Sequence, residues 1–294
     1  MTYTTAEESG TNWTLKLGDS CERLAEIDEN SVDLSVYSPP FASLFTYSPS
    51  LRDLGNASTR DEFIEHYGFI IREVLRVTKP GRISCVHVQQ LTSTKTSHGV
   101  IGLTDFRGQV IQAHVDNGWI FHGEVTVNKD PQAQAIRTKA QALMFVTKNR
   151  DSSMTRPALA DYLLMFRKPG DNAVQIKNDV SNEEWIDWAQ PVWLDIRETK
   201  TLNERVAREE ADERHICPLQ LDFIERCVRL WSNPGETVLS PFAGIGSEIY
   251  QAVKFGRYGL GIELKESYWR TAVNNLQTLE NEMGAATLFD EVTA

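Results

Sequence analysis

The spacing of hydrophobic and polar positions along the chain alternates between two periods, as expected for strands separated by helices. Apolar residues at every second position predict strands, whereas apolar residues at every third or fourth position predict helices. The strand–helix order in the first third of the chain predicts a parallel sheet covered by helices. The elements predicted there are a strand at 13–19, a helix at 21–28, a strand at 31–38, a helix at 59–78 and a strand at 82–88.

Turn and capping residues divide the rest of the chain. Thr59, with Glu62 three positions later, has the spacing of a capping box, and Pro80-Gly81 predicts the end of that helix. Gly118 and Gly256 similarly predict helix ends. The later predicted elements are a helix at 103–118, strands at 120–127 and 160–168, a helix at 219–232, a strand that runs into a glycine-rich loop at 237–247, a helix at 248–256, a strand at 258–264 and a helix at 267–283.

The composition is typical of a globular protein. The 294 residues are 41% hydrophobic and 24% charged, which is too apolar for a disordered chain and too charged for a membrane bundle. The chain shows no apolar run of the roughly 20 residues that a membrane helix needs, and its start lacks the pattern of a secretory signal. The four cysteines lack metal-type spacing. We therefore predict a cytoplasmic protein with no metal site and no membrane contact.

Charge is distributed unevenly along the chain. The formal net charge of −11 disfavours a protein that binds nucleic acid through its overall charge. Residues 123–180, however, contain nine lysines and arginines against six acidic residues, an excess of three positive charges. Much of this stretch is polar and interrupts the regular pattern of elements. We therefore divide the chain into 1–122, an inserted region at 123–190, and 191–294.

A glycine-rich loop lies between a predicted strand and a predicted helix, in the sequence Phe242-Ala243-Gly244-Ile245-Gly246. Glycines at such a turn let the backbone approach a ligand closely. Glu263 follows Gly244 by 19 residues, the spacing at which a carboxylate binds ribose hydroxyls in sheets of this type. A third small residue is missing, because Ile249 stands three positions after Gly246. The loop therefore favours a nucleoside-containing cofactor and disfavours NAD.

The tetrapeptide Ser38-Pro39-Pro40-Phe41 follows a predicted strand, at the edge where open α/β sheets bind ligands. Two prolines make a rigid corner that lacks two backbone donors and keeps its carbonyl acceptors. A serine hydroxyl can accept a hydrogen bond, and a phenylalanine ring can stack on a base turned out of a duplex. An exocyclic amine is a poor nucleophile until acceptors bind its N–H groups. The tetrapeptide is therefore suited to amine methylation, which requires neither a metal nor a cysteine nucleophile.

Together these motifs resemble those of the DNA methyltransferases that methylate exocyclic amino groups, in which the tetrapeptide reads [DNS]PP[YFW]. The resemblance covers roughly residues 13–280. The tetrapeptide precedes the glycine loop, an order that is similar to the permuted β group of these enzymes and to bacteriophage and prophage DNA methylases. It implies an α/β, class I (Rossmann-like) methyltransferase fold. In this fold 1–122 is the catalytic half, 123–190 the target-recognition region and 191–294 the cofactor-binding half.

The resemblance also implies roles for individual residues. Ser38, Pro39, Pro40 and Phe41 would form the catalytic corner, with S-adenosylmethionine as the methyl donor. The residues implied in cofactor binding are Asp19 at the adenine, Glu263 at the ribose, Phe242, Ala243, Gly244 and Gly246 around the methionine part, and His215 and Pro218 in the segment leading to it. Two departures concern Ser240, where relatives commonly have aspartate, and Asn128, where many have an aromatic residue.

The expected substrate is double-stranded DNA, methylated at specific sites on a flipped base. Candidate DNA contacts are Arg137, Lys139, Arg156, Arg167 and Lys168. Serine in the first position of the tetrapeptide favours N4 of cytosine, with N6 of adenine as the alternative. An RNA or protein amine methyltransferase and an inactive DNA-binding homologue stay open as less favoured interpretations. A homodimer and a cognate restriction enzyme are left open as well.

Overall fold

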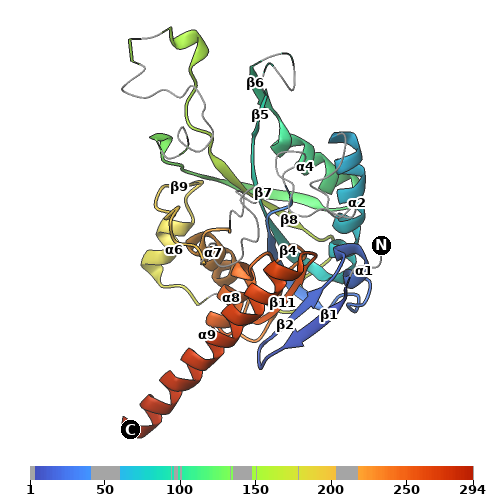
Figure 1. The fold of residues 1–294 in the computed structure, drawn as a ribbon, viewed down its shortest axis with the longest axis vertical. Helices are drawn as coiled ribbons and strands as arrows, with labels where there is room; N and C mark the ends of the chain where they lie inside the picture. Colours follow the sequence, from blue (N-terminus) through green and yellow to red (C-terminus); the bar gives the residue numbers. More distant parts are fainter. Residues whose placement is uncertain are drawn as a thin grey trace.

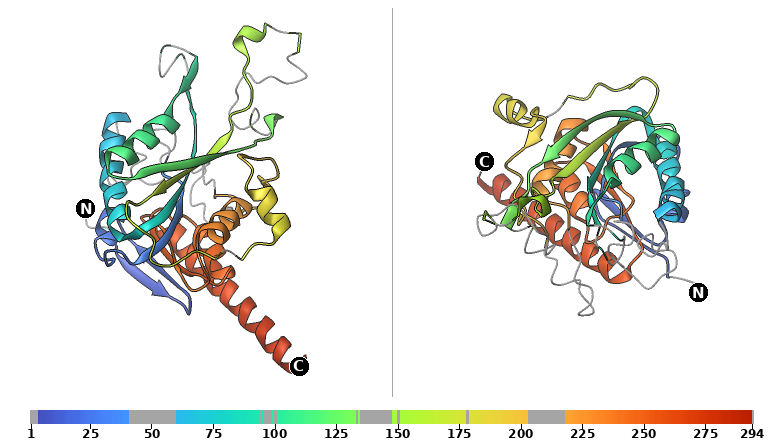
Figure 2. Two further views of the ribbon diagram at one scale, coloured as in Figure 1. Left: turned by 180° about the vertical axis from the view of Figure 1, so that it is seen from behind. Right: turned by 90° about the horizontal axis from the view of Figure 1, so that it is seen from above.

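One large mixed sheet carries helices on both of its faces (Figures 1 and 2). The structure is a computed structural model, and it describes residues 4–40, 60–93, 95, 99, 101–132, 134, 148–149, 151–177, 179–202 and 218–293. In spatial order, the strands of the sheet are β1 (Ala6–Ser9), β2 (Trp13–Leu17), β11 (Tyr258–Glu263), β10 (Thr237–Ser240), β3 (Val32–Tyr37), β4 (Thr78–Gln89), β8 (Asp161–Arg167), β7 (Ile120–Val127) and β9 (Val192–Trp193).

The helices connect these strands, and a small hairpin stands apart from the sheet. The hairpin consists of β5 (Leu91–Ser93) and β6 (Gly102–Thr104), which pair antiparallel. The helices are α1 (Ser20–Leu24), α2 (Arg60–Val77), α4 (Phe106–Asp116), α6 (Asn182–Trp188), α7 (Leu221–Trp231), α8 (Ser247–Lys254) and α9 (Glu266–Thr293), with a 3₁₀ turn, η3, at Ser152–Met154. In the described part of the chain, no helix has the length and apolar character needed to span a membrane.

Five adjacent strands, β2, β11, β10, β3 and β4, run parallel. β3 and β10 lie side by side although about 200 residues separate them, with Val238 opposite Leu34 and Leu239 opposite Ser35. The carboxyl ends of all five strands consequently meet at one edge of the sheet. The N-terminal and C-terminal thirds of the chain thus contribute to the same edge.

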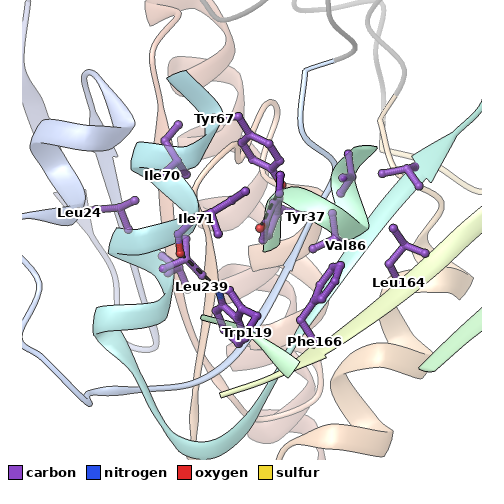
Figure 3. Packing of buried hydrophobic residues seen from close by; sticks show 14 of the residues in the cluster. Leu24, Tyr37, Tyr67, Ile70, Ile71, Val86, Trp119, Leu164, Phe166 and Leu239 are labelled. Carbon is purple, nitrogen blue, oxygen red and sulfur yellow. Dashed lines mark hydrogen bonds between the residues drawn. The ribbon is translucent and has the colours of Figure 1, made fainter. Parts of the chain in front are cut away.

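The layers follow from the alternation of side chains between the two faces of each strand. On one face, Val86, Val88 and Leu239 pack with α1, α2 and α4 in a cluster that includes Tyr67 and Phe166 (Figure 3). On the other face, alternate strand residues such as Leu34, Cys85 and Val238 pack against α7. α8 and α9 pack with β2 in a third cluster. The sheet is therefore buried on both faces, which explains why every residue of β3 and residues 82–88 of β4 are buried.

The predicted parallel sheet is confirmed for these five strands. β8, for which no direction was predicted, runs antiparallel to both β4 and β7. Two boundaries also differ. β4 begins at Thr78, so Pro80-Gly81 lies inside a strand. The helix expected from residue 103 begins at Phe106, because 102–104 pair with β5 and Asp105 caps the helix by accepting from Gly108 N at 3.0 Å.

The boundary that we expected at residue 123 passes through β7. β7 and β8 are inner strands of the sheet, so residues 123–127 and 161–167 belong to the main sheet rather than to an insertion. Their apolar residues Val125, Val127 and Leu163 complete the core on the α7 face. The recognition region that we continue to propose is therefore the segment between β7 and β8.

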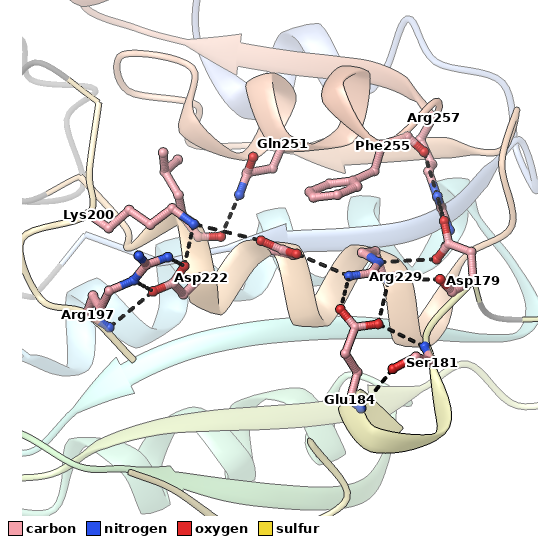
Figure 4. A network of polar contacts seen from close by, with 12 residues as sticks. Asp179, Ser181, Glu184, Arg197, Lys200, Asp222, Arg229, Gln251, Phe255 and Arg257 are labelled. Atoms are coloured by element: carbon pink, nitrogen blue, oxygen red, sulfur yellow. Dashed lines mark hydrogen bonds and ion pairs between the residues drawn. The ribbon is translucent and has the colours of Figure 1, made fainter. Parts of the chain in front are cut away.

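A network of charged side chains holds α7 against the segment that contains α6 (Figure 4). Arg229 of α7 forms ion pairs with Glu184 at 2.7 Å and with Asp179 at 3.5 Å. Arg257, whose side chain is fully buried, pairs with the same Asp179 at 2.7 Å. At the start of α7, Asp222 accepts from Lys200 at 2.6 Å. These pairs fix the segment that contains α6, and residues 197–200 after β9, on the outer side of α7.

A second polar network closes the amino edge of the central strands, opposite the edge described above. The Arg82 side chain is 1% exposed and bonds both Asp33, at 3.0 Å, and Glu236. Asp33 also accepts from Lys79 Nζ at 2.7 Å and from Thr237 N at 3.0 Å. The network links β3, β4 and β10 where these strands begin.

We expect Arg82→Met to lower the free energy of unfolding by about 3 kcal/mol, because the change removes the buried cation between Asp33 and Glu236 and leaves Glu236 without an ion-pair partner among the described residues. Urea denaturation monitored by tryptophan fluorescence measures the loss. The matched control is Arg270→Met, which breaks an exposed pair with Glu266 and should cost less than about 0.5 kcal/mol. Equal losses in the two variants would contradict the importance of burial at Arg82.

Candidate active site

The two motifs singled out in the sequence lie next to each other at the carboxyl edge of the sheet. Ser38 and Pro39 directly follow β3, and the glycine loop directly follows the adjacent β10. The rings of Tyr37 and Phe242 are in contact, with their centroids 5.8 Å apart. Two stretches that are distant in the chain therefore meet at one edge of the sheet. In an open α/β sheet such an edge between neighbouring strands is where ligands bind.

The glycine loop has a backbone conformation that favours glycine. Gly244 has φ +53° and Gly246 has φ +87°, and Gly246 caps the start of α8. A Cβ on Gly246 would lie 3.0 Å from Ala272 Cβ, so close packing also requires glycine there. A Cβ on Gly244, by contrast, would meet no other described atom within 4 Å. The loop thus has open space beside Gly244, where a ligand can approach the backbone.

Glu263 ends β11, beside this loop. Its Oε2 accepts from Gly244 N at 2.8 Å, and its Oε1 accepts from Lys265 N at 2.8 Å. Each carboxylate oxygen can accept a second hydrogen bond, so the geometry is compatible with ribose hydroxyls as additional donors. Binding at Glu263 would place a ribose directly against the glycine loop.

Asp19 lies on the other side of Glu263. Gly18 N donates to Glu263 O at 2.9 Å, and Ser20 Oγ donates to Pro241 O at 2.6 Å. Asp19 itself caps α1, because its Oδ1 accepts from Cys21 N at 2.9 Å. The predicted adenine-binding and ribose-binding residues therefore stand at the ends of neighbouring strands, β2 and β11.

Buried hydroxyls offer an independent test of whether these residues fit a cofactor. Ser240 and Ser247 flank the glycine loop, and their Oγ atoms are buried without a hydrogen-bond partner among the described residues. Unpaired buried polar atoms are rare in native proteins and point to a missing ligand or water. Together with the open space beside Gly244, they fit a polar cofactor bound over the loop.

Ser38 begins a chain of hydrogen bonds that leads into the protein. Ser38 Oγ lies 3.2 Å from His87 Nδ1 and 3.2 Å from His87 O. His87 Nε2 lies 2.9 Å from Asp161 Oδ2. Asp161 also accepts from Gln89 Nε2 at 2.7 Å and forms an ion pair with Lys129 at 2.6 Å. Ser38 is partly exposed, whereas His87, Asp161 and Lys129 are buried.

The charges along this series of hydrogen bonds determine which of its atoms carry protons. Burial alone would raise the pKa of Asp161, but His87 and Lys129 together bring that pKa below its ordinary value. An ionised Asp161 accepts from His87 Nε2–H, which leaves Nδ1 as an unprotonated acceptor. Ser38 can then donate its hydroxyl proton to Nδ1, and the Oγ lone pairs are available to accept from a substrate.

His87, Asp161 and Lys129 were not identified from the sequence. His87 is a polar residue in the apolar run of β4, two residues before the end of the strand, and this position was the available signal. Asp161 and Lys129 lie 74 and 42 residues away from it in the chain. They reach His87 because β8 runs antiparallel beside β4, so that Asp161 is placed at the carboxyl edge, opposite Gln89.

The predicted DNA contacts divide into separate groups. Arg156 Nη1 donates to Gly102 O at 3.1 Å and so connects the segment after η3 to the β5–β6 hairpin. Arg167 and Lys168 lie at the opposite edge of the sheet from Ser38, where Lys168 Nζ donates to Thr78 O at 2.7 Å. Arg167 and Lys168 were expected to bind DNA, but this position is far from a base held at Ser38. The reason is that β8 runs antiparallel to β4 and therefore ends at the opposite edge of the sheet.

Several predicted site residues lie outside the described residues. They are Phe41, Arg137, Lys139 and His215, and their roles stay predictions. Pro218 is described and directly precedes the segment that begins α7, while Asn128 is exposed at the end of β7 and donates to Trp193 O at 2.9 Å through its backbone N–H.

Comparisons with known proteins agree on the family. A family model described as DNA methylase matches residues 32–274. The type II methyltransferase M.MjaI of Methanocaldococcus jannaschii is 23% identical, over 87% of this chain and 88% of that protein. M1.MboII of Moraxella bovis is 24% identical, over 87% of this chain and 94% of that protein.

Solved structures show the same fold. TTHA0409 of Thermus thermophilus, assigned as a DNA modification methylase and complexed with S-adenosyl-L-methionine, gives a TM-score of 0.67 at 22% identity, covering 92% of this chain and 96% of that one. The PvuII DNA methyltransferase, which is specific for cytosine N4, gives 0.61 at 18% identity, covering 91% and 87%. The predicted Rossmann-like methyltransferase fold is confirmed.

The family match spans both the tetrapeptide edge and the glycine loop, and it confirms S-adenosylmethionine as the cofactor. The chain belongs to the family of DNA methylases that use S-adenosylmethionine to methylate the exocyclic amino group of cytosine or adenine.

Proposed function

We propose that this protein methylates N4 of cytosine at specific sites in double-stranded DNA, and that Ser38 is the catalytic residue that binds the amino group. One observation carries the proposal: Ser38 Oγ is held by His87 at the sheet edge that also carries the glycine loop. The hydroxyl that accepts from the substrate therefore stands beside the place proposed for the methyl donor.

The two acceptors at this corner have complementary tasks. The lone pair of an exocyclic amine is delocalised into the base, so the nitrogen becomes nucleophilic only as it turns pyramidal. Ser38 Oγ and the Pro39 carbonyl would accept from the two N–H groups and favour that geometry. Pro39 has no backbone N–H that could compete for these acceptors, and proline fixes the backbone angle φ on which its carbonyl position depends.

A proton must leave the nitrogen once it has been methylated. S-adenosylmethionine supplies a methyl group on a sulfonium, whose sulfur keeps the bonding electron pair when the methyl is transferred. The methylated amine is then cationic, and Ser38 Oγ is placed to pass one of its protons to His87 Nδ1. Asp161 stabilises the resulting imidazolium through its 2.9 Å contact with His87 Nε2. His87 and Asp161 thus act through Ser38, as positioning and proton-accepting residues.

The preference for cytosine rests on the first residue of the tetrapeptide. Members of this enzyme group that resemble the chain in having serine there are typically N4-cytosine enzymes, whereas aspartate is typical of N6-adenine enzymes. The PvuII methyltransferase, whose fold is similar, is an N4-cytosine enzyme. These two features favour cytosine over adenine as the target of this chain.

Two projections on the same end of the molecule are suited to reading the DNA sequence. The β5–β6 hairpin and the segment around η3 both extend away from the sheet, opposite to the C-terminal end of α9 (Figure 1). Arg156 joins them by its bond to Gly102 O. Both projections emerge from strands that pass the active edge, since β5 continues β4 and Asp161 of β8 lies beside His87.

The base preference is tested with the purified protein, tritiated S-adenosylmethionine and genomic DNA from a strain without DNA methylases. We expect label in the DNA, and nucleoside digestion with mass spectrometry should show N4-methylcytosine. Ser38→Ala should lose at least about 100-fold in rate, because the hydroxyl acceptor is gone. N6-methyladenine would overturn the cytosine assignment, and undiminished activity of the variant would overturn the role of Ser38.

The proton pathway predicts which kinetic constant depends on His87. His87→Asn keeps an acceptor near Ser38 but removes the basic nitrogen, and it should lower kcat by about 100-fold with little change in the KM for DNA. Steady-state rates measured over a series of DNA concentrations give both constants.

Asp161→Asn and an exposed histidine provide the comparison. Asp161→Asn should also lower kcat, because the imidazolium loses its negative partner, while binding of S-adenosylmethionine stays unchanged. The control His66→Asn, on the exposed side of α2, should leave kcat as in the wild type. If His87→Asn retained the wild-type kcat, His87 would not be the proton acceptor.

A further inference from the structure

A buried carboxyl group without a cationic partner lies next to the glycine loop. Glu248 is the second residue of α8 and is 4% exposed. In the described part of the chain, no lysine or arginine forms an ion pair with it. Charged side chains are seldom buried unless they are paired or hydrogen-bonded, because losing their hydration is costly. Glu248 therefore requires an explanation that packing alone does not give.

Unpaired polar atoms gather around the same helix end. Besides Ser240 and Ser247, the Oε1 atoms of Gln220 and Gln251 are buried without a partner among the described residues. Gln251 stands three residues after Glu248, so both lie on one face of α8. Gln251 Nε2 donates to Leu221 O at 2.7 Å, which directs that face toward the start of α7. The start of α7, the start of α8 and the end of β10 together form one polar region, in which several buried side-chain oxygens lack a hydrogen-bond partner among the described residues.

The charged groups on the neighbouring elements leave Glu248 without compensation. On β11, the negative charge of Glu263 acts on it unfavourably. On α7, Asp222 is engaged by Arg197 and Lys200, and Glu225 by Arg229. At the start of α9, Glu266 pairs with Arg270, and Lys265 lies over the ring of Tyr268. Lys254, on α8 itself, is exposed at the far end of the helix.

Burial therefore has a large effect on the protonation of Glu248. Burial first, and the charge of Glu263 to a smaller extent, raise the pKa of Glu248 to about 8, against an opposing hydrogen bond from its own backbone N–H. In the ligand-free protein at neutral pH the carboxyl is protonated and neutral. A cation brought against it would favour the ionised form and release the proton.

We propose that Glu248 binds the α-ammonium group of S-adenosylmethionine. The inference rests on the proposed placement of the cofactor, with its ribose at Glu263 and its amino-acid part over the glycine loop. The strand residue before the loop is Ser240, a neutral hydroxyl, so Glu248 is the acid available on this side. The unpaired Ser240, Ser247, Gln220 and Gln251 oxygens would complete the polar surroundings of the amino-acid part.

Calorimetric binding to the purified full chain tests the proposal with three ligands. S-adenosylmethionine and S-adenosylhomocysteine both carry the α-ammonium, and 5′-methylthioadenosine lacks the amino-acid part. Glu248→Gln should weaken the first two about tenfold or more at pH 7.5 and leave the third unchanged. Weakening of S-adenosylmethionine alone would assign Glu248 to the sulfonium and overturn the proposal. Loss of binding to 5′-methylthioadenosine would show general damage to the site, and would overturn it as well.

Proton release gives a second readout. Between pH 6 and 7 the carboxyl is protonated before binding and ionised after it, while the ligand's own α-amino group stays charged. Wild-type binding should therefore release close to one proton, seen as a dependence of the heat on the buffer, and the affinity should rise about tenfold over this pH unit. Glu248→Gln should show neither effect. Equal proton release by the variant would contradict the proposal.

Stability separates a ligand-binding role from a structural one. In the unfolded chain Glu248 ionises around its ordinary pKa of 4.5, but in the folded chain only around 8. The folded wild type is therefore disfavoured increasingly as the pH rises from about 4.5 to 8. Ligand-free Glu248→Gln should have a higher Tm than the wild type at pH 7.5, whereas a structural role predicts a lower one. Glu282→Gln, exposed on α9, should leave Tm and binding unchanged.

One further variant separates this inference from the placement on which it rests. Glu263→Gln should weaken 5′-methylthioadenosine as well as S-adenosylmethionine, because both carry the ribose. If it affects neither, the proposed cofactor placement is wrong. If it weakens both while Glu248→Gln weakens none of the three ligands, the placement holds and the role of Glu248 is refuted.

Discussion

The pairing of β3 with β10 is the constraint on which the active edge depends. These strands come from opposite ends of the chain, yet Leu34 lies opposite Val238 and Ser35 opposite Leu239. A parallel register at this point fixes where both strands end, and so places Ser38 beside the glycine loop. Hydrogen bonds between strands do not depend on the order in which the strands are synthesised. The tetrapeptide can therefore precede the cofactor loop in sequence while the edge stays complete.

The sequence was most informative where a local pattern determines the structure. β7 has the predicted bounds 120–127, and the glycine loop follows its strand as expected, because both depend on neighbouring residues. The direction of β8 could not be predicted, since the alternation of apolar residues is the same in either direction. With that direction unknown, Asp161 could not be assigned to the active edge, nor Lys168 to the opposite one. The helix α6 was missed because its side chains bury little, so it lacks an apolar periodicity.

Long-range contacts also explain why His87 was overlooked. A single histidine in a strand is usually a core residue, and its partners here are 49 residues upstream and 74 residues downstream. Glu263 and Asp19 could be named from the sequence because they stand in motifs that resemble those of the DNA methyltransferases. The buried polar chain behind Ser38 depends instead on which side chains this particular sheet places next to β4. Such residues become visible only when the strand order is known.

Two buried acids near the active edge show how the same desolvation produces different chemistry. Burial raises the pKa of both Asp161 and Glu248, but Asp161 has His87 and Lys129 beside it and its pKa is lowered overall. Glu248 has a second carboxylate nearby and no cation of its own among the described residues, so its pKa stays high. A permanently paired acid is suited to orienting a neighbour, because its charge does not change when the substrate binds. An unpaired acid is suited to a ligand that brings its own positive charge, because the ion pair then exists only in the complex.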